Sequence, residues 1–232
     1  MSEDIRKYYS SRVSQADRNK FLWQVGKTID GKEVSEDQLD IIVNTIRAKL
    51  KLGHDDSVLD VGCGNGLITK IIAGRVKDVV GIELTPELFD IAREYNQLGN
   101  ISYINNDILY MSPADFSSKI SKVYLYEVLQ HMDYPNVYAL INMFTEILNK
   151  DSVVFIGGIL DEEKKWQFID SYERRCSYLS ALINKEDALG IWFHQDYLRC
   201  IGEDLGFNVE CFPQERALYT SGYRFDCVLR KL

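Results

Sequence analysis

A buried strand that runs directly into a glycine-rich loop constrains this chain more than any other feature. Residues 58–67 read Val-Leu-Asp-Val-Gly-Cys-Gly-Asn-Gly-Leu, so an apolar run ends in a loop with glycine at every second position: Gly62, Gly64 and Gly66. Glycine tolerates positive φ and has no Cβ, so the backbone can approach a ligand closely, and the helix expected next presents free N–H groups at its start. The pattern predicts a strand, a ligand-binding turn and a helix in succession.

Length, charge and cysteine content set the broad class of protein. The chain has 232 residues, 46% of them hydrophobic, which suffices for one full core and a small appendage. A formal net charge of −8 argues against broad contact with a nucleic acid backbone and favours a small-molecule partner. The five cysteines lack the spacing of a disulfide framework or a zinc site, and no run reaches the ~18 apolar residues of a membrane span. We expect a cytoplasmic protein without a signal peptide or a membrane partner, and the oligomeric state stays open.

Apolar runs alternate with amphipathic helices along the middle of the chain. We expect strands at 57–61, 78–83, 101–105, 122–126 and 152–159. This alternation implies right-handed βαβ crossovers and an open α/β fold whose parallel sheet is covered on both faces. Two later runs, 207–212 and 223–229, leave no room for a helix between them and are expected to pair as an antiparallel hairpin.

One helix start carries a full set of local signals. Ser35 is expected as the N-cap residue, with Gln38 three positions later completing a capping box. Apolar residues at helical spacing then continue to about residue 50. The pattern predicts a packing helix immediately before the first strand of the sheet.

Two acidic residues narrow the choice of ligand for the glycine loop. A dinucleotide fingerprint requires Gly-x-Gly-x-x-Gly, whereas position 67 is leucine. Asp60, two residues before the first glycine, would repel a pyrophosphate and attract a cation. Glu83 ends the second strand 83 − 62 = 21 positions after Gly62, close to the ~20-residue offset at which an acidic residue binds ribose hydroxyls. A nucleoside with a cationic amino-acid tail fits both carboxylates, and S-adenosylmethionine is such a molecule.

From about residue 55 to the C-terminus the sequence resembles the class I S-adenosylmethionine-dependent methyltransferases. Residues 58–66 are similar to the first motif of that family, 106–108 to the motif that contacts the adenine amino group, and 127–132 to the fourth motif, beside the transferred methyl. The resemblance implies a Rossmann-like sheet of seven strands, mostly parallel, with an antiparallel C-terminal hairpin and helices on both faces.

By this resemblance the glycine loop and Asp60 hold the methionine end of the cofactor, Glu83 binds the ribose and Leu84 lies against the adenine. Cys63 is expected to be a small filler rather than a nucleophile. The implied cofactor-binding residues are Asp60, Gly62, Cys63, Gly64, Gly66, Leu67, Glu83, Leu84, Asp107, Ile108, Glu127 and Val128. The expected cofactor is S-adenosylmethionine, with S-adenosylhomocysteine as the product.

Two segments lie outside the repeating βαβ pattern, and both are rich in aromatic and charged residues. We expect residues 1–34 to form an N-terminal helical lid, and residues 35–232 to form the methyltransferase domain with a lid insertion at about 160–194. Covering the sheet edges is an equally good interpretation of both segments. Residues 24–32 resemble methyltransferases encoded with bacterial surface-polysaccharide genes, which implies a sugar, a sugar-nucleotide or a phosphorylated precursor as the acceptor.

Methyl transfer from a sulfonium is an in-line displacement, so positioning and exclusion of water supply most of the catalysis. A protonated acceptor would also need a base, and His131, just after the fourth strand, is the candidate by chain position. Orienting the loop is the alternative role for His131, and capping a helix is the favoured one for His194. The candidate substrate contacts, several of which also suit simple packing, are Tyr8, Tyr9, Trp23, Lys27, His194, Arg216 and Tyr219.

The sequence therefore predicts a metal-independent enzyme that transfers a methyl group to an oxygen, or second to a nitrogen, of a small polar acceptor. No cluster of Asp or Asn follows the later strands to hold a metal. Two alternatives stay open. A tRNA or protein methyltransferase would need a basic patch near the site, and a non-catalytic domain would keep only the cofactor pocket.

Overall fold

The computed structural model describes residues 3–116, 119–184 and 190–232. A seven-stranded sheet runs through it in the order β5-β4-β3-β6-β7-β9-β8. Neighbours from β5 to β7 are parallel, whereas β9 is antiparallel to both β7 and β8. The strands are β3 (Ser57–Val61), β4 (Asp78–Glu83), β5 (Ile101–Asn105), β6 (Ile120–Tyr126), β7 (Leu148–Leu160), β8 (Phe207–Pro213) and β9 (Arg224–Lys231). The predicted sheet and its C-terminal hairpin are confirmed.

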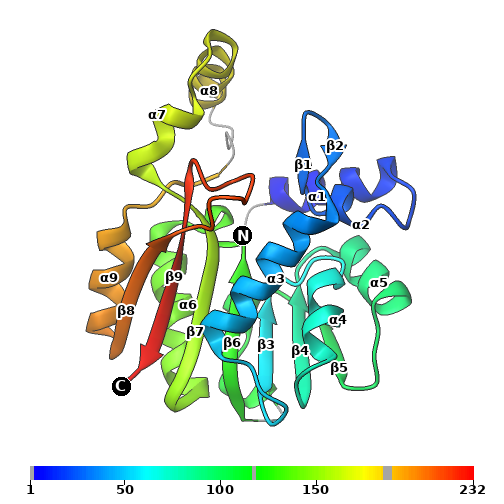
Figure 1. The fold of residues 1–232 in the computed structure, drawn as a ribbon, viewed down its shortest axis with the longest axis vertical. Helices are drawn as coiled ribbons and strands as arrows, with labels where there is room; N and C mark the ends of the chain where they lie inside the picture. Colours follow the sequence, from blue (N-terminus) through cyan, green and yellow to red (C-terminus); the bar gives the residue numbers. More distant parts are fainter. Residues whose placement is uncertain (1–2, 117–118, 185–189) are drawn as a thin grey trace.

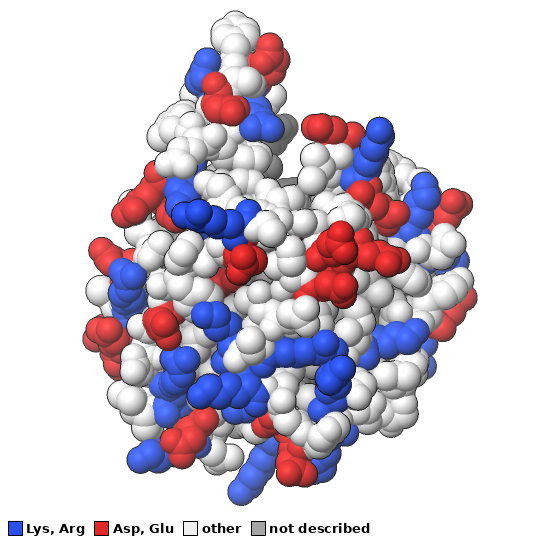
Figure 2. All heavy atoms as spheres, in the orientation of Figure 1, with Lys and Arg blue, Asp and Glu red and all other residues white. Residues whose placement is uncertain are grey.

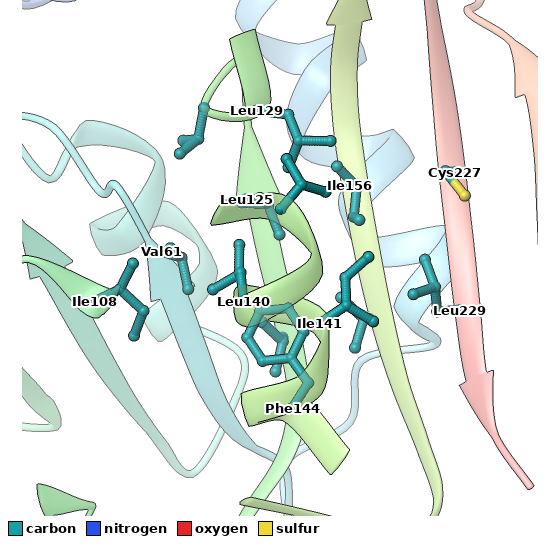
Figure 3. Packing of buried hydrophobic residues seen from close by; sticks show 14 of the residues in the cluster. Val61, Ile108, Leu125, Leu129, Leu140, Ile141, Phe144, Ile156, Cys227 and Leu229 are labelled. Atoms are coloured by element: carbon teal, nitrogen blue, oxygen red, sulfur yellow. The ribbon is translucent and has the colours of Figure 1, made fainter. Parts of the chain in front are cut away.

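Helices cover both faces of the sheet, because successive strand residues point to opposite sides. Val58 of β3 packs with α3 and α4, whereas its neighbour Leu59 belongs to the core with α6 and α9. In Figure 3, Leu140, Ile141 and Phe144 of α6 lie against β6 and β7. The helices that flank the sheet are α3 (Glu36–Leu50), α4 (Leu67–Ala73), α5 (Pro86–Tyr95), α6 (Tyr134–Ile147) and α9 (Gln195–Asp204).

The start of α3 differs from its prediction. Ser35 is the N-cap residue, but its side chain makes no capping hydrogen bond. The Gln38 amide instead donates to the carbonyl of Ala217 at 3.0 Å and accepts from the backbone N–H of Tyr219 at 2.8 Å. The predicted capping box is wrong because these tertiary partners, far away in the sequence, occupy the side chain that would complete it.

Two segments stand at the end of the sheet where the parallel strands finish (Figure 1). The first contains α1 (Glu3–Gln15), α2 (Phe21–Gln24) and the small hairpin of β1 (Thr28–Ile29) and β2 (Lys32–Glu33). The second contains the 3-10 turn η4 (Glu162–Lys164), α7 (Lys165–Phe168) and α8 (Tyr172–Asn184), which rise as a tower; residues 185–189 of the predicted insertion lie outside the described residues.

Three further 3-10 turns follow strands β5 and β6. After β5 come η1 (Ile108–Tyr110) and η2 (Pro113–Asp115), and after β6 comes η3 (Leu129–His131). Among the described residues, none of the helices has the length and apolar character needed to cross a membrane.

Candidate active site

The glycine loop between β3 and α4 has the left-handed backbone that its sequence predicts. The φ angles are +69° at Gly62, +58° at Gly64 and +76° at Gly66, a region that side chains with a Cβ rarely adopt. A Cβ on Gly62 would lie 2.6 Å from Cγ2 of Val128, and one on Gly64 would lie 2.9 Å from Cγ1 of Val25. Glycine is therefore required both for the turn and for the close approach of neighbouring segments.

The N–H groups of this loop are used within the protein. Gly62 and Cys63 both donate to the carbonyl of Ile82, at 2.8 and 3.0 Å, and Gly64 donates to Oε2 of Glu83 at 2.9 Å. The N–H of Leu67, at the start of α4, lies 3.3 Å from Oδ1 of Asn65. The loop is therefore tied to β4 by its own amides, and at the start of α4 the N–H of Leu67 is already paired within the loop.

Gly66→Ala is expected to destabilise the protein by about 2–5 kcal/mol, because the new Cβ would combine left-handed strain with overpacking. It would meet the Tyr103 hydroxyl and lie 3.0 Å from Cβ of Ala92. Chemical unfolding measures the change. Gly99→Ala is the matched control, since an added Cβ there meets no atom within 4 Å and its φ is not positive. Equal stability of the two variants would contradict the prediction.

A cavity of about 110 Å³ lies against the glycine loop. Glu83 lines it with a buried carboxylate, whose second oxygen accepts from the N–H of Thr85 at 2.7 Å. Burial raises the pKa of Glu83, while the hydrogen bonds from Thr85 and Gly64 oppose that rise. The predicted cofactor residues in its wall are Gly62, Cys63, Gly64, Leu67, Glu83, Leu84, Glu127 and Val128.

Asp60 lies outside this lining. Its Oδ2 accepts from the Thr69 hydroxyl at 2.6 Å and from the Tyr124 hydroxyl at 2.5 Å, so it joins β3 to α4 and β6. Burial raises the pKa of Asp60 to about 7, although both hydrogen bonds lower it. This geometry gives Asp60 a structural role beneath the loop, and its predicted contact with the cofactor stays a prediction.

Asp60→Asn is expected to flatten the pH dependence of stability. A carboxyl whose folded pKa is raised favours the folded state at low pH, and that contribution is lost as pH rises from about 4, its unfolded value, to about 7. Asparagine keeps a hydrogen-bond acceptor but does not titrate. The free energy of unfolding of the wild type minus that of the variant should therefore fall by up to about 4 kcal/mol across this range. A constant difference between pH 4 and 7 in chemical unfolding would contradict this.

Three other predicted cofactor residues also lie outside the lining of the cavity. The Asp107 side chain accepts from the N–H of Leu109 at 3.0 Å and begins η1, and Ile108 packs in the core. Gly66, at the end of the loop, packs against Tyr103. Their proposed contacts with an adenosyl group stay predictions.

The N-terminal segment is attached to the glycine loop by a residue within the loop itself. The Asn65 side-chain amide donates to the carbonyl of Phe21 at 2.7 Å and to Oε1 of Gln24 at 2.8 Å. Asn65 is 1% exposed and Gln24 is fully buried. Asn65 was not among the predicted site residues, although its position between two loop glycines was a signal that could have identified it.

Glu127 lies directly after β6 in a backbone conformation that is rare for its residue type, with φ of +60°. Its side chain passes over Gly158, where a Cβ would come within 2.6 Å of Cγ of Glu127. Lys27, from the N-terminal segment, donates to Oε2 at 3.0 Å in a buried ion pair. The other oxygen, Oε1, is buried and has no hydrogen-bond partner among the described residues.

The charge state of Glu127 is set by its neighbours. Burial raises the pKa of this carboxyl, but the charges of Lys27 and Arg224 outweigh burial and hold it below its ordinary value. Glu127 is therefore an ionised, largely buried carboxylate at neutral pH, and its Oε1 has no hydrogen-bond partner among the described residues.

His131 belongs to a second group of contacts beside Glu127. Its Nε2 lies 3.2 Å from the Tyr9 hydroxyl and 3.3 Å from the Gln130 amide nitrogen. Arg224 in turn donates to Oε1 of Gln130 at 2.6 Å and to the carbonyl of Gly158. Burial first, and the Arg224 guanidinium second, lower the pKa of His131 to about 4, against the effect of Glu127. The imidazole is thus neutral at physiological pH. Arg224 was missed because nothing near it in the sequence distinguishes it from an ordinary strand residue.

A larger cavity, of about 1240 Å³, opens beside the first one between the N-terminal segment and the tower. Figure 2 shows a notch in the surface at this place. The residues common to the walls of both cavities are Ile5, Tyr9, Val25, Glu127 and His131. The two cavities therefore share a wall that carries a carboxylate and a neutral imidazole.

The remaining predicted substrate contacts lie partly in the walls of the two cavities and partly outside them. Tyr8 and Tyr219 line the larger cavity, and Lys27 lines the smaller one. Trp23, Arg216 and His194 line neither cavity. The Arg12 guanidinium lies over the Trp23 ring, 4.6 Å from its centroid. His194 is the N-cap residue of α9, although its side chain makes no capping hydrogen bond. Within the described residues, no three of His, Cys, Asp or Glu are grouped closely enough to hold a metal ion.

Part of this chain is similar to known methyltransferases. Residues 58–151 match the family model described as a methyltransferase domain. The mitochondrial ubiquinone biosynthesis O-methyltransferase of Saccharomyces cerevisiae is 26% identical over 167 residues, which cover 66% of this chain and 52% of that protein. The ribosomal RNA small subunit methyltransferase A of Caldanaerobacter subterraneus subsp. tengcongensis is 33% identical over 84 residues, covering 36% of this chain and 31% of that protein. The chain thus spans about half or less of the length of these relatives.

The fold is shared with solved methyltransferases. The N-methyltransferase NodS from Bradyrhizobium japonicum, crystallised with S-adenosylhomocysteine, superimposes with a TM-score of 0.66 at 15% identity, covering 99% of both chains. The fold is that of a class I methyltransferase. Residues 58–151 therefore match a methyltransferase domain, and the described residues adopt the fold of solved methyltransferases.

Proposed function

We propose that this protein transfers a methyl group from S-adenosylmethionine, bound in the smaller cavity, to a small acceptor in the larger one. The observation that carries this proposal is the wall shared by the two cavities, with Glu127 and His131 in it. In-line displacement requires donor and acceptor to meet across one short boundary from which water is excluded. When bound, the cofactor supplies an activated methyl on a sulfonium, and the chain has to orient the acceptor and receive its proton.

The residues around the smaller cavity fit an adenosyl ligand. Glu83 presents a buried carboxylate at the end of β4, where ribose hydroxyls would find an acceptor, and the Leu84 side chain provides an apolar surface beside it. The crystallised neighbour with S-adenosylhomocysteine supports the same assignment.

Glu127 is well placed to orient the acceptor. A buried, ionised oxygen without a partner is costly, so a ligand that donates a hydrogen bond to it gains affinity. Glu127 lines both cavities, which favours an acceptor that bears a hydroxyl or an amine beside the methyl. The strained backbone at Glu127 is consistent with a functional position.

The acceptor is proposed to have an acidic hydroxyl. With a pKa of about 4, His131 is too weak a base to deprotonate an ordinary alcohol efficiently, and Glu127 is also a weak base. A phenol or an enol loses its proton far more readily. Aromatic side chains in the larger cavity, among them Phe168, Tyr219 and Tyr223, suit a planar acceptor of this kind.

Other acceptors receive less support. The surface-polysaccharide acceptor stays a prediction that rests on residues 24–32 alone, and weak bases suit a sugar hydroxyl poorly. An RNA acceptor has the ribosomal RNA methyltransferase among the relatives in its favour, but that match covers only 36% of this chain. Methyl transfer without a metal or a nucleic acid partner is part of the proposal.

Isothermal titration calorimetry with S-adenosylhomocysteine, with NAD as the comparison ligand, tests the cofactor assignment. We expect micromolar or tighter binding of S-adenosylhomocysteine and none of NAD; the reverse pattern would overturn the assignment. Measuring the S-adenosylhomocysteine released with panels of phenols, enols, sugar nucleotides and amines then tests the acceptor class. Release with sugar nucleotides but not with phenols or enols would overturn the acidic-hydroxyl proposal.

A further inference from the structure

Two thiols face each other across the last two strands of the sheet. Cys211 of β8 and Cys227 of β9 are direct partners in the antiparallel register, and their Sγ atoms lie 3.5 Å apart. The Cα atoms of such partners are separated by about 4.5–5.5 Å, inside the range of about 4.4–6.8 Å that disulfides span. Small side-chain rotations therefore suffice to bring the sulfurs to bonding distance.

The two thiols differ in their access to solvent and in their acidity. Cys227 is fully buried, whereas Cys211 is partly exposed. The hydrogen bond with Cys227 lowers the pKa of Cys211, burial opposes this, and the Arg199 guanidinium lowers it further, against the carboxylates of Asp196 and Asp161. An oxidant in solution thus meets Cys211 first, and Cys227 lies behind it as the second thiol.

This pair lies at the base of a loop that forms part of the larger cavity. Residues 214–223 connect β8 to β9, and Tyr219, Thr220 and Tyr223 line that cavity. Gln214, at the start of the loop, accepts from the Thr220 hydroxyl at 2.7 Å. A covalent bond between the two strands would enclose the whole loop and restrict its opening.

We propose that Cys211 and Cys227 form a redox-active dithiol whose oxidation to a disulfide restrains the 214–223 loop. The Cys211 thiolate attacks a glutathione disulfide, forming a mixed disulfide and releasing one glutathione thiolate. The Cys227 thiol then attacks Sγ of Cys211 and displaces the second glutathione, which leaves with a proton. Two protein thiols are thereby oxidised, and one glutathione disulfide is reduced to two thiols. This inference rests on the hairpin alone and stands independently of the proposed methyl transfer.

Peptide mapping of the full chain after incubation with oxidised glutathione tests the first part of the proposal. We expect one disulfide that joins the peptides of Cys211 and Cys227, a mass lower by about 2 Da for that pair, and full reversal by dithiothreitol. The exposed thiols Cys176 and Cys200 should give mixed glutathione disulfides only. Finding Cys211 and Cys227 both free to react with iodoacetamide after unfolding of the oxidised sample would overturn the proposal.

Two variants and a second measurement complete the test. Cys211→Ser should leave Cys227 unmodified, and Cys227→Ser should stop at a mixed disulfide on Cys211; a mixed disulfide on Cys227 in the first variant, or none on Cys211 in the second, would contradict the assigned order. Hydrogen exchange of residues 214–223 should slow by at least about threefold in the oxidised protein. An unchanged rate in protein that carries the disulfide would overturn the link to the loop. Since the wild-type map needs no substitution, it decides the first part even where a variant fails to fold.

Discussion

Replacing Glu83 with alanine is expected to weaken the binding of S-adenosylhomocysteine by about 100-fold or more. In the proposed complex the carboxylate accepts from two ribose hydroxyls, and a hydrogen bond to a charged group contributes about 1.5–3 kcal/mol. The loss of two such bonds corresponds to at least two factors of ten in affinity, at about 1.4 kcal/mol each. The same carboxylate holds the N–H groups of Gly64 and Thr85, so its loss also loosens the loop that faces the cofactor.

Calorimetry provides the measurement, and two further variants make it specific. Glu146→Ala removes an exposed carboxylate of α6 and should bind as the wild type does. Glu83→Gln keeps the shape of the side chain but loses its charge, so it serves where the alanine variant unfolds. Wild-type affinity in a folded Glu83 variant of either kind would remove the ribose assignment.

Replacing Glu127 with glutamine is expected to lower kcat/KM for the acceptor found in the screen by about 100- to 1000-fold, with S-adenosylhomocysteine affinity changed by less than about threefold. Glutamine has a neutral amide in place of the carboxylate. This amide cannot receive a proton from the acceptor, so methyl transfer should slow. Steady-state kinetics and calorimetry separate the two effects.

A control is needed because Glu127→Gln leaves Lys27 buried without its ionic partner, a change that can cost about 3–5 kcal/mol of stability. The double variant Glu127→Gln/Lys27→Met removes both charges and should recover most of that loss in thermal unfolding. It should still transfer methyl slowly. A folded double variant with wild-type turnover would show that the carboxylate does not act on the acceptor.

Much of the fold could be predicted because its signals are local. The strand at 57–61, the glycine turn and the strand ending at Glu83 are set by apolar runs and by the φ angles that only glycine adopts easily. Helix starts were less predictable. Asp133 caps α6, where its side chain accepts from the N–H of Asn136 at 2.9 Å, whereas the capping box predicted at Ser35 and Gln38 does not form.

The candidate site was only partly predictable. His131, Tyr9 and Glu127 were all named from the sequence, but the wall they share between two cavities depends on the N-terminal segment meeting the end of β6. Glu127 and Lys27 are 100 positions apart, and no local pattern pairs them. Asp60 shows the same limit, since its carboxylate accepts from the hydroxyls of Thr69 and Tyr124, and no local pattern predicts these partners.

The sequence by itself determined the parallel α/β sheet, the glycine turn and the acidic residue that ends the second strand of that sheet. These features depend on residues that are neighbours along the chain, where backbone conformation and hydrophobic periodicity act directly. Only the tertiary structure decided which oxygen of Glu127 lacks a partner among the described residues, where Asp60 lies, and that Cys211 faces Cys227. Those outcomes depend on long-range packing, because the hydrogen-bond partners of a buried polar group come from side chains that are distant in the sequence.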